Sequence, residues 1–318
     1  MRGLRRRSYG KKMLARGIMK YLIQLLRDGQ LSLTEYVNLR ADIHWVESLQ
    51  VIKESRMSPP PAFLLLSGAG VMLIVAVLFW RCCRQGWWYA VGVGAGAWAL
   101  GVLLKFAWAI PVNGPIKRGL EHLLGKAAAD PFFWLYVGLL TGVFECGMTL
   151  IMVLRTRLRR ANWSAAVAFG IGFGGMEAFL VGAVSFFSLL ATIVFFNVIP
   201  ADARAKLIGD VWQASGHEIS FVVLPIIERV SALFIHCFSC VLIVYGARVL
   251  QWRWFWLSFA YKTMVDGIAA WGLLGWQVQQ SHTKMLQLEA IFVVLAICGL
   301  AGLRAMRPAF SKLEVVPE

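Results

Sequence analysis

The chain has 318 residues, of which 59% are hydrophobic, and a formal net charge of +15 at pH 7. Several apolar runs have about the twenty residues that a helix needs to cross a bilayer, so the composition excludes a soluble globular protein. Most basic residues flank these runs or lie in the first part of the chain. Membrane topology and anionic lipid therefore explain the positive charge, and a nucleic-acid partner is not expected.

Residues 1–57 are predicted to be a short, basic helical extension that is too polar to cross the membrane. Its segment Leu25–Tyr36 resembles the SHOCT motif, a short helix-turn-helix, which implies a homo-oligomer or a partner bound through this extension. The alternative is a basic amphipathic helix that lies on a membrane surface. Ser58-Pro59-Pro60-Pro61 ends the extension. The bundle is expected over residues 58–305 and a tail over residues 306–318.

The rest of the chain is predicted to be all-α, a polytopic helical membrane bundle with about seven spans. The fourth apolar run is long for one crossing of a ~30 Å core, so it must tilt, kink near its glycines or end in an interfacial helix. The predicted spans are Ala62–Trp80, Trp87–Val112, Phe132–Leu154, Ser164–Ile199, Phe221–Ala247, Trp254–Trp276 and Met285–Leu303.

Basic loops gather at one end of this predicted bundle, at Arg81–Gln85, Arg155–Arg160 and Arg248–Arg253. That end should face the cytoplasm, in a bacterial cytoplasmic membrane. Seven spans then place the amino-terminal extension outside, although its own basic residues favour the inside. Either the first apolar run is re-entrant or the natural start is Met57.

A set of eight ionisable residues inside the predicted spans is the candidate site, because an unpaired charge there is costly and usually faces a partner or a cavity. Counting ~1.5 Å per residue from the basic loops places those of four different helices at similar depths. We therefore predict that they converge near the middle of the membrane. The eight are Lys105, Glu145, Glu177, Glu228, Arg229, His236, Lys262 and Asp266.

Three interpretations of this polar set are open. It is a salt-bridge network that only holds the spans together, in which Lys262 is expected to pair with Asp266 within one helix or with Glu145. It is a proton or ion pathway, as in a transporter or a proton-coupled channel. Or it is a site that acts on a substrate, or that descends from one that did.

Two further patterns point away from cofactors. Gly170–Gly175 spells G-x-G-x-x-G, but no strand precedes it, so these glycines are expected to permit close helix packing, as are Gly138 and Gly142. Only His236 among the histidines lies within a span, so zinc is not indicated. We expect no cofactor, and zinc held by one His and carboxylates is possible but not indicated.

Four motifs occur in a fixed order: Gly142-Val-Phe-Glu145-Cys-Gly-Met-Thr149, Ala168-Phe-Gly-Ile-Gly-Phe-Gly-Gly-Met-Glu177-Ala, Glu228-Arg-Val-Ser-Ala-Leu-Phe-Ile-His236, and Lys262-Thr-Met-Val-Asp266. Over roughly residues 62–305 they resemble the YhfC family of predicted bacterial intramembrane peptidases, related to CAAX-processing and PrsW-type glutamic proteases. The resemblance implies catalytic roles for Glu145, Glu177, His236 and Asp266 on membrane protein or peptide substrates. It leaves Lys105, Glu228, Arg229 and Lys262 as supporting ion-pair residues.

The chain departs from the family pattern at four positions. Cys146 stands where a second Glu is expected, and Thr149 replaces an Arg. Phe173 and Lys262 each replace a His. Because these positions would carry the chemistry, we expect a catalytically impaired member that keeps the bundle and a substrate groove. The alternatives are an active endopeptidase that uses Glu145 and His236, and the transporter or channel named above.

Overall fold

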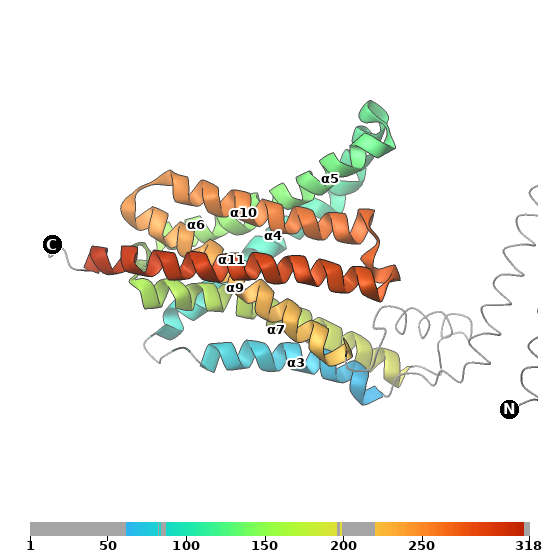
Figure 1. Cartoon of the computed structure of the whole chain (residues 1–318), viewed down its shortest axis with the longest axis horizontal. Coiled ribbons are helices and arrows are strands. Elements are labelled where there is room, and N and C mark those ends of the chain that lie inside the picture. The colour runs from blue at the N-terminus through green and yellow to red at the C-terminus, as the bar shows by residue number, and fades with distance from the viewer. Residues whose placement is uncertain (1–61, 82, 84–86, 196–197, 199–219, 315–318) are drawn as a thin grey trace, which may run out of the picture. The chain divides into compact units, whose positions relative to one another are not determined.

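The computed structural model describes residues 62–81, 83, 87–195, 198 and 220–314. Over these residues the chain is a bundle of long helices without a β-strand (Figure 1). The predicted basic extension, residues 1–57, and its SHOCT-like segment lie outside the described residues.

Each predicted span corresponds to a helical segment of the described chain, and five of these helices are long and apolar enough to cross a membrane. The prediction of an all-α helical membrane bundle is therefore confirmed. The segments are α3 (Ala62–Arg81), α4 (Trp88–Leu124), α5 (Lys126–Thr141) continued by η2 (Gly142–Cys146) and α6 (Gly147–Arg155), α7 (Trp163–Val194), α9 (Ser220–Val249), α10 (Trp252–Ala270) continued by η5 (Trp271–Gly275), and α11 (His282–Glu314).

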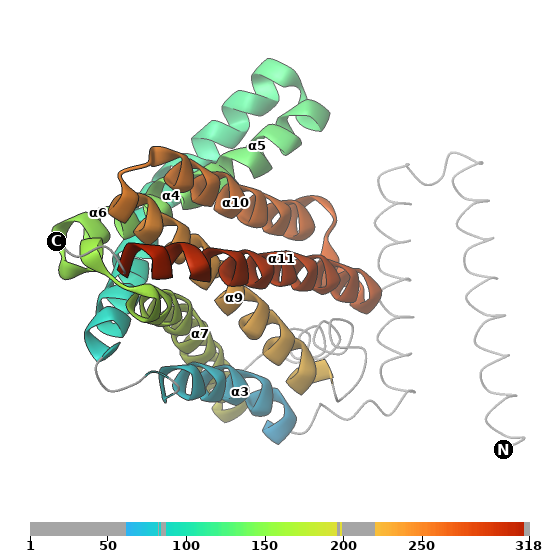
Figure 2. The same cartoon turned by 60° about the vertical axis from the view of Figure 1, so that its left-hand side comes forward.

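Helix α9 is the central element, and α3, α7, α10 and α11 all pack on it (Figure 2). Its second half is almost fully enclosed, with Val241 to Val244 at most 1% exposed. Helix α4 packs on α7, and α5 packs on α4 and α10. Large apolar side chains such as Leu103, Ile110 and Val184 stay on the outer surface, as expected for a face that meets lipid.

Glycines set the closest approaches between these helices. The segment Gly170–Gly175 is continuous α-helix within α7. A Cβ atom at Gly172 would collide with the backbone of Val91 in α4, and one at Gly138 would collide with the backbone of Thr263 in α10. The prediction that these glycines serve helix packing is confirmed, because their neighbours occupy the space of the missing side chain.

Helix α7 is a single α-helix of 32 residues, which makes it ~48 Å long and longer than a ~30 Å hydrocarbon core. Its first residue follows Asn162, whose side chain accepts a hydrogen bond from the backbone N–H of Ala165 at 3.0 Å. This cap fixes the start of the helix beside the basic loop, so the excess length lies at the other end.

Helix α11 extends beyond the predicted span and through most of the predicted tail, to Glu314. Phe310 is fully buried, with ring centroids 5.6 Å from Trp163 and 5.3 Å from Tyr245. The guanidinium of Arg248 donates to the carbonyls of Ala161 and Leu313, at 2.8 and 3.0 Å. These contacts hold the last turns of α11 against the basic end of the bundle, and Met306 and Phe310 are buried there.

Helix α4 also exceeds its predicted span and forms a protruding hairpin with α5 (Figure 1). It continues through Pro111 and Pro115 to Leu124, and Gly125 turns the chain with φ +75°. Lys117 lies 3.9 Å from the carboxylates of both Glu121 and Asp130, which links the two arms.

Candidate functional site

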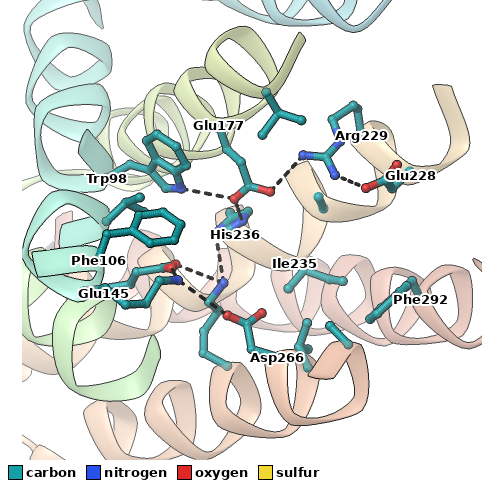
Figure 3. A pocket seen from close by; sticks show the side chains of 17 residues that line it. Trp98, Phe106, Glu145, Glu177, Glu228, Arg229, Ile235, His236, Asp266 and Phe292 are labelled. Atoms are coloured by element: carbon teal, nitrogen blue, oxygen red, sulfur yellow. Dashed lines mark hydrogen bonds and ion pairs between the residues drawn. The ribbon is translucent and has the colours of Figure 1, made fainter. Parts of the chain in front are cut away.

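All eight predicted ionisable residues line one cavity of about 350 Å³ between α4, η2, α7, α9, α10 and α11 (Figure 3). Apolar side chains, among them Phe106, Ile235 and Phe292, form the remainder of its wall. The convergence inferred from depth along the helices is therefore present in the structure. The position of each residue along its helix does not predict which of these groups pair with one another.

Glu145 is 3% exposed and lies in the π-helical turn η2. Such turns often mark functional positions in helices, because the inserted residue changes which side chains face inward. One oxygen of the Glu145 carboxylate is paired with the ammonium group of Lys105, and the other lies 3.2 Å from that of Lys262. Both oxygens are thus engaged by cations.

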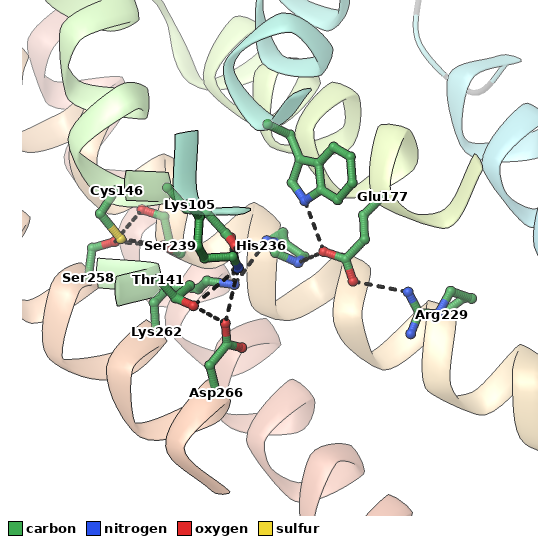
Figure 4. Close-up of polar contacts among 12 residues, drawn as sticks. Lys105, Thr141, Cys146, Glu177, Arg229, His236, Ser239, Ser258, Lys262 and Asp266 are labelled. Carbon is green, nitrogen blue, oxygen red and sulfur yellow. Dashed lines mark hydrogen bonds and ion pairs between the residues drawn. The ribbon is translucent and has the colours of Figure 1, made fainter. Parts of the chain in front are cut away.

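Glu177 receives three donors. Oε1 accepts a hydrogen bond from Arg229 at 3.0 Å, and Oε2 accepts from the indole N–H of Trp98 at 3.1 Å. His236 Nε2 lies 2.6 Å from the same Oε2 (Figure 4). Charge-assisted bonds of this kind orient a carboxylate firmly, so Glu177 is a fixed acceptor at the edge of the cavity.

His236 connects the two carboxylate clusters. Its Nδ1 lies 3.3 Å from Lys262 Nζ, and its Nε2 faces Glu177. An ammonium group can only donate, so Nδ1 accepts from Lys262 and the proton of the neutral ring resides on Nε2. A continuous chain therefore runs from Glu145 through Lys262 and His236 to Glu177.

Asp266 pairs across helices and not with Lys262, its neighbour one turn earlier in α10. It accepts a hydrogen bond from the Thr141 hydroxyl and lies 4.0 Å from Lys105 Nζ. Lys262 instead bonds to Glu145 and His236. Of the two partners expected for Lys262, Glu145 is therefore confirmed, whereas the alternative pairing with Asp266 within one helix is not found, because the ammonium group is turned into the bundle.

Glu228 and Arg229 form an ion pair at the other end of the cavity. The Arg229 side chain is 8% exposed, whereas that of Glu228 is 40% exposed. Arg229 thus connects the half-buried Glu177 to the more exposed carboxylate of Glu228.

The remaining family positions, Cys146, Phe173 and Thr149, are buried. Cys146 Sγ lies 3.9 Å from the hydroxyl of Ser239 and 3.8 Å from that of Ser258. The Phe173 ring packs against the His236 ring, with centroids 5.1 Å apart. Thr149 is 1% exposed.

Sequence reasoning did not single out Trp98 or Thr141, although each bonds directly to a carboxylate of the site. A tryptophan in an apolar span carries no signal of its own. Thr141 could have been identified from the sequence, because it is four residues before Glu145 and so lies on the same face of the helix.

Comparison with known proteins adds to this geometry. Residues 70–288 match the family described as YhfC intramembrane metalloprotease. The chain belongs to the YhfC family. The uncharacterized membrane protein YhfC of Bacillus subtilis (strain 168) is 29% identical to this YhfC-family chain over 209 residues, which cover 58% of this chain and 74% of that protein. No solved structure matches. The family match and the apolar helices together show an integral membrane protein.

The family description names a metalloprotease, whereas the cavity of this YhfC-family member does not fit a metal ion. In the described part of the chain, no three His, Cys, Asp or Glu residues are placed to hold one. The Glu145 carboxylate forms ion pairs with Lys105 and Lys262, and the Glu177 carboxylate contacts Arg229 and His236. The carboxylate oxygens that a metal ion would need as free ligands are therefore paired with ammonium and guanidinium groups.

Proposed function

We propose that this YhfC-family protein binds a membrane-embedded polypeptide segment in the cavity but does not hydrolyse peptide bonds. The observation that carries the proposal is the double engagement of Glu145 by Lys105 and Lys262. To activate water, a carboxylate needs an oxygen that is free to take a proton or to hold a metal ion. Oε1 of Glu145 is paired with Lys105, and Oε2 accepts no hydrogen bond within the described residues but lies 3.2 Å from the Lys262 ammonium group, so a cation faces each oxygen. Cys146 stands where the resemblance to the family implies a second carboxylate.

The rest of the cavity supports the retained binding role. Its volume of about 350 Å³ is in the range of ligand-binding pockets, and its walls combine apolar side chains with a few oriented polar groups. Phe106 and Val181 lie on α4 and α7, and Phe292 lies on α11. An unwound segment bound in the cavity would contact these apolar side chains as well as the carboxylates.

A cleavage assay in proteoliposomes tests the proposal, with a panel of membrane-spanning peptides as substrates. We expect no cleavage by the wild-type protein. Combined substitution of Cys146→Glu, Thr149→Arg, Phe173→His and Lys262→His should restore detectable cleavage. The matched control adds Glu145→Ala to those four changes and should be inactive. Robust cleavage by the wild type that disappears in the Glu145→Ala single variant would contradict the proposal.

A second candidate, an active endopeptidase, is favoured by the contact between His236 and Glu177 at 2.6 Å. A carboxylate that orients a histidine is an arrangement that many hydrolases use for proton transfer. In this protein, however, the other ring nitrogen of His236 is occupied by Lys262. This candidate predicts wild-type cleavage that both Glu177→Gln and His236→Gln abolish, and the same assay measures it.

A further inference from the structure

We propose that the cavity selects a ligand with a single ammonium group on an apolar body, and that Asp266 is the main residue that recognises the ammonium. A lysine-bearing membrane peptide and a membrane amphiphile with a primary amine share this chemistry. The inference rests on the proposed function in one respect, because it uses the same cavity as the binding site. It adds the chemical class of the ligand.

The first support is the charge of the cavity wall. Its basic residues are Lys105, Arg229 and Lys262, and its acidic residues are Glu145, Glu177, Glu228 and Asp266. His236 is neutral in the hydrogen-bond pattern described above, so the wall holds one more carboxylate than it holds cations. An uncompensated negative charge among apolar helices is costly, and a bound cation would offset it.

The second support is the difference in exposure between the acids and the bases. Lys262 and Arg229 are buried beneath the cavity surface, with side chains 3% and 8% exposed. The side chains of Glu228, Asp266 and Glu177 are 40%, 26% and 20% exposed, and among the four described lining acids only that of Glu145, at 4%, is as buried as these bases. Lys105, at 20%, is the only lining base among the described residues with comparable exposure. An entering group therefore meets mostly carboxylate oxygens.

The third support is the spare bonding capacity of Asp266. Its Oδ2 accepts from Thr141 and lies 4.0 Å from Lys105 Nζ. Its other oxygen has no hydrogen-bond partner within the described segments, and Figure 3 shows it turned from those contacts toward the side where Ile235 lies. A carboxylate accepts several hydrogen bonds, so this oxygen is available to an ammonium group.

The apolar part of the wall defines the remainder of the ligand. Ile235 and Val265 lie beside the carboxylates, and Phe106 and Phe292 add aromatic rings. Aromatic faces attract cations and also pack against methylene groups. A bare inorganic cation would leave these walls without a partner, whereas an alkyl-bearing ammonium would contact both kinds of surface.

A neighbouring cavity extends the site. It has a volume of about 400 Å³, lies between α4, α5 and α10, and shares Lys105, Phe106, Asp266 and Ala269 with the first cavity. Asp266 therefore lies at the junction of two spaces. A long apolar chain that places its ammonium at Asp266 has room for its body on both sides.

The test is a binding measurement with the full chain in lipid nanodiscs. The probes are three fluorescent amphiphiles of equal chain length with a primary ammonium, a hydroxyl or a sulfate head group. Two leucine-rich membrane peptides with a central Lys or a central Gln complete the set. We expect the ammonium and Lys probes to bind at least about ten-fold more tightly than their uncharged counterparts.

Asp266→Asn should reduce that preference to less than about two-fold, and Lys105→Gln should increase it, because it removes the exposed competing cation. Glu121→Gln, on α4 outside both cavities, is the matched control and should leave the preference unchanged. If Asp266→Asn does not fold, Glu228→Gln is the substitute and should weaken the preference in the same direction.

Equal binding of charged and uncharged probes by the wild type, or an unchanged preference in Asp266→Asn, would overturn the inference. Selective binding of the Lys peptide alone would assign the ammonium to a polypeptide, and selective binding of the amphiphile alone would assign it to a lipid. Cleavage of the Lys peptide by the wild type would refute the proposed loss of hydrolysis but leave the ammonium preference standing. The two proposals thus fail on separate measurements.

Discussion

Lys262→Met tests whether the ion pair with Glu145 holds the bundle together. The Lys262 side chain is 3% exposed and that of Glu145 is 4% exposed, so water does not replace the lost partner. Removing one member of a buried ion pair costs about 3–5 kcal/mol when the other is left unpaired. Lys105 still engages the second Glu145 oxygen, so we expect a smaller loss of unfolding free energy, of about 2 kcal/mol.

The measurement is thermal unfolding in detergent, followed by the fluorescence of the tryptophans, of which the chain has 14. Lys262→Met should lower the Tm, and adding Glu145→Gln should recover part of the loss, because it removes the carboxylate that was left underpaired. Lys117→Met, at a side chain 40% exposed, is the control and should change little. An unchanged Tm in Lys262→Met would refute the reasoning, because it would show that the ammonium group reaches water.

Two further predictions concern packing. Phe310→Ala should destabilise the bundle by about 3–5 kcal/mol, because it empties a fully buried site between Trp163 and Tyr245, and the same detergent unfolding measures it. If residues 306–314 were a tail that does not pack on the bundle, this substitution would leave the Tm unchanged. Gly172→Val should prevent the close approach of α7 to Val91 in α4 and reduce the yield of folded protein in size-exclusion chromatography, whereas Gly119→Val, which has open space around it, should not.

The sequence alone determined the membrane class, the approximate positions of the spans and the set of charged residues at the centre. These features depend on the length of apolar runs and on the rise per residue of a helix, both of which are local. Depth along each helix placed Glu145, Glu177, His236 and Asp266 at one level. All four line the same cavity in the folded chain.

The apolar runs did not predict where the helices end. Helix α11 continues to Glu314 because Phe310 and Arg248 find partners at the basic end, and those partners come from distant parts of the chain. Helix α4 likewise continues past its predicted span to Leu124, where it packs against α5. Hydropathy marks where a span leaves the apolar core but not where a helix ends.

Only the tertiary structure decided which charged groups pair. Spacing within α10 favoured Lys262 with Asp266, but the bundle directs Lys262 to Glu145 and His236, and Asp266 to Thr141. The physical reason is that pairing depends on how each helix is rotated about its axis and on how closely it approaches its neighbours. Side-chain packing between helices sets both quantities, and no single helix contains that information.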